Sequence, residues 1–174
     1  MNNTIITSLK KSADKKQELF LILDKLNSKA LQKSKSENSW DVMQVLTHLY
    51  EAESGALRYI KKKYLGIEEL KKGNWKNYRN FILMQTILYL PTKFKAPKAV
   101  SNPNVTLSYE ELKSAYINID KEFEDFLKDY SVDYMRKAIY KHPFAGMLTV
   151  LQMLKFQRAH LFHHKRQITN LLKA

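Results

Sequence analysis

The stretch LTVLQMLKFQRAHLFHHKRQITNLL, residues 148–172, has the apolar spacing of one long helix. Its main apolar stripe consists of Leu151, Leu154, Leu161, Ile168 and Leu172, and a second, adjacent stripe consists of Met153, Phe156 and Leu171. Three of the five histidines in the chain fall inside the same stretch. A helix with one apolar side buries that side against other elements, so the fold depends on what the rest of the chain supplies.

Three other segments show the same helical spacing of apolar residues. They are residues 4 to about 32, residues 40 to about 64, and a segment that begins after Ser108. Ser39 is expected to cap the helix that opens at Trp40, and Ser108 with Glu111 has the pattern of a capping box. A shorter helix is expected over residues 75–90.

The remaining segments lack a clear helix or strand pattern. The connection PTKFKAPKAVSNPNVT, residues 91–106, contains three prolines and is expected to be irregular. Residues 134–146 are expected to form a loop, because no alternation of apolar and polar residues is strong enough to require a sheet. The sequence therefore predicts an all-α fold: a four-helix bundle with a short additional helix and a proline-rich connection, in a single domain over residues 1–174.

The composition excludes several classes of site. The chain contains no cysteine, so disulfides, thiolate metal sites and a cysteine nucleophile are excluded. Glycine motifs that bind phosphates or dinucleotides are absent, as is the glycine–serine motif of serine hydrolases. The N-terminus lacks the apolar region of a signal peptide, and the longest apolar run, residues 81–90, is too short to span a bilayer. We therefore expect a cytoplasmic protein without a membrane partner.

The charge balance is strongly basic, with 30 Lys and Arg against 17 Asp and Glu and a net charge of +13. Such an excess raises the question of a nucleic-acid partner. The basic residues are scattered along the chain, however, and lysine greatly outnumbers arginine, the residue that base and phosphate recognition favours. We interpret the charge as a solvated, lysine-rich surface, which argues against a nucleic-acid partner. The sequence leaves a homodimer open.

Histidines in the last helix have the spacing of metal ligands. His160 and His164 are four residues apart, so they lie on the same face about one turn from each other. His163 is expected to point away from them, because adjacent helical positions are 100° apart. Two ligands bind weakly, and His48 is the candidate for a third because it lies on the apolar stripe of the helix that opens at Trp40. Three neutral imidazoles would leave positions for water or substrate.

Each of these histidines also has a simpler interpretation. A histidine on an apolar face is commonly a core residue, and a pair at this spacing is commonly a surface feature. Glu51 and Glu53 lie near His48 and are candidates for supporting carboxylates or a base, although exposed carboxylates are the commoner case. His142 precedes a proline and is expected to fix a loop rather than to bind metal. The zincin motif is absent, because Leu161 follows His160.

Taken together, three elements of the chain resemble the DinB-like (YfiT-type) superfamily of small helical bundles. They are WDVMQVLTH at 40–48, HPFAGMLT at 142–149, and HLFHHKRQI at 160–168. The proline-rich FKAPKAV at 94–100 is also similar, and the resemblance covers about residues 36–170. It implies a four-helix bundle in which His48, His160 and His164 hold a divalent metal ion.

The resemblance also implies a class of reaction. Characterised relatives are thiol-dependent transferases that use low-molecular-weight thiols such as bacillithiol or mycothiol, and many members have no known reaction. We therefore expect a metal-dependent S-transferase with a small-molecule thiol and an electrophilic substrate as partners. Two alternatives remain: a metal-dependent hydrolase, and a non-catalytic metal-binding or stress-response protein. Imidazole ligands suit Zn, Ni or Fe, and the sequence does not choose among them.

Overall fold

The computed structural model describes residues 2–36, 39–90 and 103–173. The chain is mostly helical, with a small β-hairpin. The helices are α1 (Asn3–Leu23), α2 (Ser28–Leu31), α3 (Val42–Tyr64), α4 (Trp75–Tyr89), α5 (Tyr109–Lys128) and α6 (Val150–Lys173). The hairpin consists of β1 (Ala138–His142) and β2 (Gly146–Thr149), and short 3-10 helices cover Ile67–Glu69 and Val132–Tyr134.

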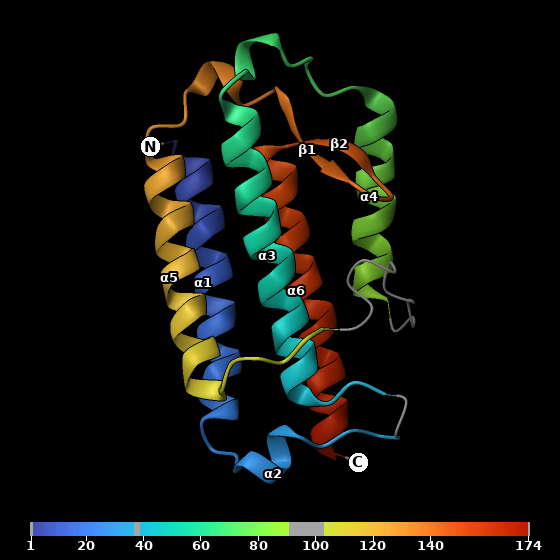
Figure 1. The fold of residues 1–174 in the computed structure, drawn as a ribbon. Coiled ribbons are helices and arrows are strands. Elements are labelled where there is room, and N and C mark those ends of the chain that lie inside the picture. The colour runs from blue at the N-terminus through green and yellow to red at the C-terminus, as the bar shows by residue number, and fades with distance from the viewer. Residues whose placement is uncertain (1, 37–38, 91–102, 174) are drawn as a thin grey trace.

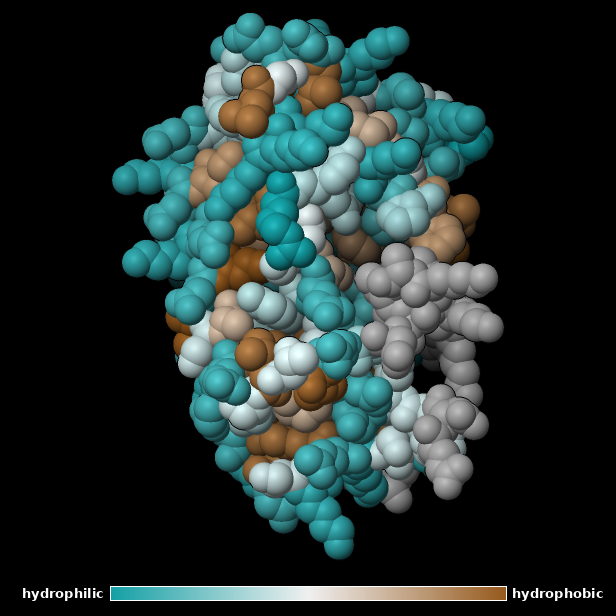
Figure 2. Space-filling view, in the orientation of Figure 1, coloured by the Kyte–Doolittle hydropathy of each residue, from teal (hydrophilic) through white to brown (hydrophobic). Residues whose placement is uncertain are grey.

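Four long helices form the bundle that the apolar spacing predicts (Figure 1). Helix α1 packs against α5 and α6, and α3 packs against the same two helices, so the four close into a ring. Helix α4 lies outside this ring, against α6 and the hairpin. The predicted fold class is therefore confirmed. The surface in the same orientation is hydrophilic over most of its extent, with scattered apolar residues (Figure 2).

Two groups of apolar side chains fill the bundle, one toward each end. One group includes Leu23, Leu46, Leu112 and Ile168, all of which are almost fully buried. The other includes Ile60, Leu127 and Met153, which have no exposed surface. Both groups draw residues from several helices, so each holds several elements of the ring together.

The starts of two helices test the predicted caps. Ser108 accepts from the backbone N–H of Glu111, whose side chain accepts in return from the Ser108 N–H, so this capping box is confirmed. The predicted cap at Ser39 is wrong, because α3 begins two residues later. There the Asp41 carboxylate accepts from the Gln44 N–H at 2.7 Å, and the Gln44 side chain accepts from the Asp41 N–H at 3.0 Å. A reciprocal box satisfies two helix donors, whereas Ser39 alone satisfies one.

The predicted first helix, residues 4 to about 32, is also shorter in the structure. Helix α1 ends at Leu23, and the Asn27 side chain accepts from the Ala30 N–H to start the one-turn helix α2. Asparagine is a strong helix-starting residue, and here it interrupts a segment whose apolar spacing alone would allow one helix.

The expectation of a loop over residues 134–146 is wrong in part, because residues 138–149 form an antiparallel hairpin. His142 pairs with Gly146, which has a φ of 78°, and Lys141 pairs with Met147. Ile139 and Leu148 are fully buried, so packing against the bundle stabilises strands of only five and four residues. Strand pairing and packing are not visible in the period of so short a segment.

The predicted proline-rich connection, residues 91–106, lies largely outside the described residues. Its described part, residues 103–106, has neither helix nor strand. No described helix has the length and apolar character needed to cross a membrane.

Candidate metal centre

His48, His160 and His164 converge between α3 and α6. The Nε2 atom of His160 lies 3.2 Å from Nε2 of His48 and 3.0 Å from Nε2 of His164. His48 and His164 are buried, and His160 is half-buried. Neighbouring nitrogen ligands about 2.0–2.1 Å from one metal ion are about 3.0–3.4 Å apart, so the spacing of these atoms fits a shared ion. No carboxylate belongs to the group within the described ranges.

Hydrogen bonding alone does not satisfy this arrangement. His164 Nδ1 lies 2.8 Å from Oε1 of Gln167, an acceptor, so Nδ1 carries the proton and Nε2 of the neutral ring has a free lone pair. His160 Nε2 carries either a proton or a lone pair, so it cannot make a full hydrogen bond of complementary kind to both neighbours when one of them is an acceptor. Three neutral imidazoles that all turn a lone pair to one point would instead be served by a metal cation.

Aromatic rings pack against the histidines and reduce their exposure to solvent. Trp40 lies beside His48 and His164, with ring centres 5.0 and 6.4 Å away. Phe156 stacks on His160 with ring centres 5.3 Å apart and an angle of 16°. Burial lowers the pKa of His164 to about 3 and holds the pKa of His160 well below its usual range. Both imidazoles are thus kept neutral, the form that binds metal.

His163 lies outside the cluster, as predicted. Its ring is perpendicular to that of His164, and its side chain interacts with the backbone of Leu88 on α4. The 100° step between adjacent helical positions separates the two histidines. Of the pair at 163 and 164, only His164 joins His48 and His160.

The two candidate carboxylates take different positions, and neither joins the histidines. Glu51 is exposed. Glu53 is buried, contrary to the commoner case, and its Oε2 lies 2.6 Å from Nζ of Lys16, which also lies 2.5 Å from Oδ1 of Asp120. Burial alone would lower the pKa of Lys16, but Glu53 and Asp120 outweigh that effect and raise it. Lys16, which is 4% exposed, is therefore an exception to the solvated, lysine-rich surface expected from the charge.

Sequence reasoning missed the pairing of Lys16 with Glu53. Lys16 sits one turn before the buried Leu19 and Phe20 on α1, and that position gave a signal of burial. The partner depends on the register between α1 and α3, which the sequence does not display. Glu53 is thus committed to an ion pair and is not available as a base for the histidine site.

His142 fixes the hairpin turn, as predicted. Its Nδ1 accepts from the backbone N–H groups of Phe144 and Ala145, at 3.2 and 3.1 Å. The residue is 6% exposed, and its ring meets Phe156 edge-on with centres 4.4 Å apart. His142 therefore lies next to the aromatic ring that stacks on His160, although it is not one of the three converging ligands.

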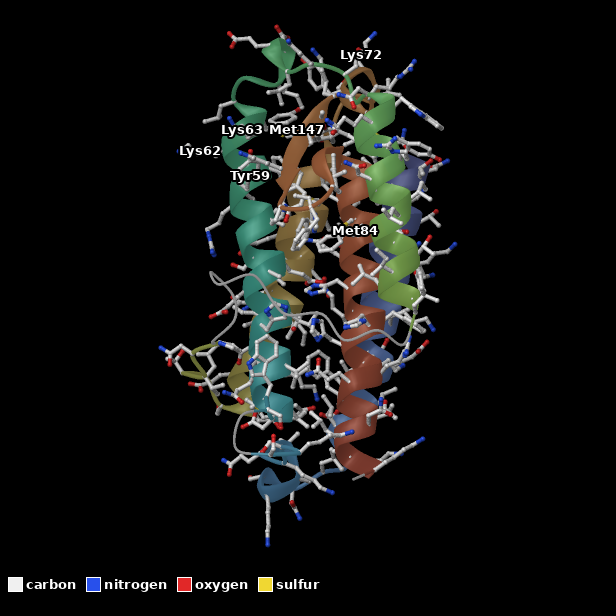
Figure 3. The ribbon with its side chains drawn as sticks, turned by 90° about the vertical axis from the view of Figure 1, so that its right-hand side faces the viewer. Tyr59, Lys62, Lys63, Lys72, Met84 and Met147 are labelled. Atoms are coloured by element: carbon white, nitrogen blue, oxygen red, sulfur yellow. The ribbon has the colours of Figure 1, made fainter. Side chains whose placement is uncertain are left out.

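Side chains of three elements are labelled on the hairpin side of the molecule: Tyr59 of α3, Met84 of α4 and Met147 of β2 (Figure 3). In the same view Lys63 lies level with Met147, and Lys72 lies above both. A cavity of about 260 Å³ lies beside the hairpin, lined by Lys72 and Met147 among others, and none of the histidines contributes to it.

Comparison with protein families assigns this architecture. The sequence model of the DinB superfamily matches residues 14–168. The chain belongs to the DinB superfamily. The match covers nearly the whole bundle and starts earlier than the resemblance at 36–170, so α1 shares in it. Neither the curated proteins nor the solved structures gave a match.

Membership in the DinB superfamily agrees with the two features found here, the helical bundle and the buried three-histidine cluster. The cluster links α3 and α6, two elements that are separated by more than 80 residues in the sequence. Their residues meet because the ring of helices places α3 directly against α6.

Proposed function

We propose that His48, His160 and His164 bind one divalent metal ion and that this DinB protein transfers a low-molecular-weight thiol to an electrophile. The observation that carries the proposal is the convergence of three Nε2 atoms without a fourth protein ligand in the described part of the chain. A structural zinc site has four protein ligands, whereas three leave a position for a reactant. Zn, Ni and Fe all suit imidazole ligands.

A bound divalent ion would supply one kind of chemistry here, the lowering of the pKa of a coordinated thiol. The chain's own residues account for the rest. Gln167 holds the tautomer of His164 so that Nε2 faces the site. Trp40 and Phe156 cover the imidazoles and limit the access of water, which strengthens electrostatic interactions within the site.

The basic surface of the protein favours a thiol cosubstrate that carries carboxylate groups. A net charge of +13 attracts anionic solutes toward the protein and raises their local concentration near its surface. Lys63 and Lys72 add positive charge on the hairpin side of the molecule (Figure 3). The absence of cysteine in the chain is compatible with this role, because the reacting sulfur then comes from the cosubstrate.

Cobalt-substituted protein tests the proposal, because cobalt(II) has visible absorption that reports its ligands. Protein purified without a histidine tag is first analysed for its metal content and then loaded with cobalt. We expect a thiolate charge-transfer band when bacillithiol or 2-mercaptoethanol is added. The His163→Ala variant, which keeps all three ligands, should show the same band.

Other results identify the alternatives. Bound metal without any thiol band rejects the transferase and leaves a metal-dependent hydrolase or a structural metal. Such a hydrolase would cleave an activated ester in the presence of metal and lose this activity with a chelator. A protein that takes up no divalent metal rejects the proposal as a whole.

A further inference from the structure

We propose that His142 is a second functional residue of this site, whose Nε2–H donates a hydrogen bond to an acceptor oxygen of the electrophile. The inference rests on the proposed function, because it concerns the substrate that would react beside the metal. The class of substrate that it selects is an electrophile with a carbonyl or comparable oxygen next to the carbon that is attacked.

The hairpin turn determines the proton position of His142. Two backbone N–H groups, those of Phe144 and Ala145, point at Nδ1. Nδ1 must therefore carry the lone pair, and the proton of the neutral ring must be on Nε2. Burial lowers the pKa of His142 to about 4, so the ring stays neutral around pH 7 and keeps this tautomer.

The other side of the ring is free to bind a ligand. Nδ1 and Nε2 lie on opposite sides of an imidazole, so Nε2 is directed away from the turn. The hydrogen bonds of His142 within the described ranges involve only Nδ1, and none of them uses Nε2. The role in the turn thus explains one nitrogen of His142 and leaves a fixed donor unused.

Packing places this donor close to the candidate metal ligands. The ring centre of Phe156 lies 4.4 Å from that of His142 and 5.3 Å from that of His160. A ligand that extends past Phe156 from the three-histidine cluster would therefore reach His142.

In the reaction, this donor would stabilise the charge that develops on the oxygen of the electrophile. When a thiolate attacks an electrophile of this class, a sulfur–carbon bond forms and an electron pair of the electrophile moves onto the oxygen. The proton that the thiol lost is then returned to the product. A neutral N–H donor stabilises the oxygen as its negative charge grows and is not consumed.

Two substitutions separate the two nitrogens of His142. The amide oxygen of His142→Asn can replace Nδ1 as the acceptor for the turn, but this side chain is too short to replace Nε2. The amide nitrogen of His142→Gln reaches the position of Nε2, but this side chain does not preserve the turn acceptor. If ligand binding depends on the turn, His142→Gln should weaken it more than His142→Asn. If binding depends on the Nε2–H donor, His142→Asn should weaken it more.

The experiment measures the binding of two uncharged thiols to cobalt-loaded protein by the thiolate band, and a carbonyl oxygen carried by the thiol stands in for the oxygen of the electrophile. 3-Mercaptopropionamide has a carbonyl oxygen, whereas 1-butanethiol has a similar length and none, and neither has a charge that surface lysines would attract. We expect wild-type protein to bind the amide about three- to tenfold more tightly, the size of one net hydrogen bond. His142→Asn should lose this preference without weaker binding of 1-butanethiol, and His142→Gln should retain part of it.

The outcomes are distinct. An unchanged preference in His142→Asn would show that His142 serves only the turn and would overturn the inference while the thiol site stands. The absence of a band with either thiol would reject the proposed function and this inference with it. Nitrogen-15 spectra of the imidazoles add an independent check, since a proton on Nδ1 of His142 would overturn the inference whatever the thiols do.

Discussion

Two polar clusters are buried in the bundle, and they differ in how their members are satisfied. In the Lys16–Glu53–Asp120 cluster, one ammonium lies 2.6 and 2.5 Å from two carboxylates, so each charge has an opposite charge beside it. In the histidine cluster, three like groups face one another at 3.2 and 3.0 Å, and none of them brings an opposite charge. Both include a residue of α3, five positions apart.

The difference separates a structural cluster from a binding site. The ion pairs are complete within the protein and fix how α1, α3 and α5 meet. The histidine cluster includes no carboxylate within the described residues, and burial disfavours protonation of His160 and His164, so its nitrogens suit a cation. Close contacts between like polar groups thus point to a binding site, whereas complete ion pairing points to architecture.

The largest expected effect comes from His164→Ala, which should abolish stoichiometric metal binding. The variant retains two ligands on different helices and loses the one that Gln167 orients. Stability of the metal-free protein should fall less than when the buried Lys16 loses its charge, because the change removes a neutral side chain and breaks no ion pair. Metal analysis after dialysis, with thermal unfolding of the metal-free form, checks both statements. His163→Ala is the matched control and should keep its metal; the reverse result would mean that the wrong histidine was assigned.

Lys16→Met should show the opposite pattern, with lower stability and an intact metal site. Removal of the ammonium leaves the buried Glu53 without its countercharge, which costs about 3–5 kcal/mol of unfolding free energy. Urea unfolding measures the loss. Lys15→Met is the control, since Lys15 is exposed and pairs with Glu18 only at the surface, and it should cost less than about 1 kcal/mol. Equal costs for the two variants would refute the distinction between the clusters.

The two clusters also mark what the sequence predicts and what it does not. His48, His160 and His164 could be selected because helical spacing and apolar stripes are local properties, and these three do converge. The same spacing predicted the bundle. The ion pairs were missed because they depend on the register between helices distant in sequence, and a lysine in a basic chain has no distinctive local pattern.

The predictions for the hairpin and for the helix starts failed for related reasons. Strands of five and four residues show too few alternations to identify, and the burial of Ile139 and Leu148 that stabilises them comes from the rest of the fold. Asp41 replaced Ser39 as a cap because its partner, Gln44, completes a box that single-residue preference does not reveal. Local patterns predicted the elements, and pairings between residues set their details.

The Gln167→Leu substitution should have a smaller effect, which concerns the affinity for metal. The substitution removes the acceptor at 2.8 Å from Nδ1 of His164 and keeps all three ligands. Loss of such an orienting partner typically weakens metal affinity about 10- to 100-fold. Competition with a chromophoric chelator measures the affinity. Gln152→Leu is a control on the same helix, because the Gln152 side chain accepts from the Thr149 N–H and lies three turns from His164.

The smallest effect concerns acidification of the metal-free protein. The folded state lowers the pKa of His142 to about 4 and of His164 to about 3, whereas the unfolded chain has the ordinary value of about 6.5. On acidification the unfolded state therefore takes up protons first, so stability is lost as the pH falls below about 6.5. Between about pH 7.5 and 5.5 each of these histidines should cost about 1 kcal/mol. The salt-bridged carboxylates Glu18 and Asp24 have lowered pKa values and lose their contributions only at more acid pH, whereas burial raises the pKa of Glu53, which acts in the opposite direction. Urea unfolding at several pH values therefore compares the slope of the wild type with that of His142→Asn, which should be smaller by the share of one histidine. Equal slopes in the two proteins would mean that burial does not hold His142 neutral.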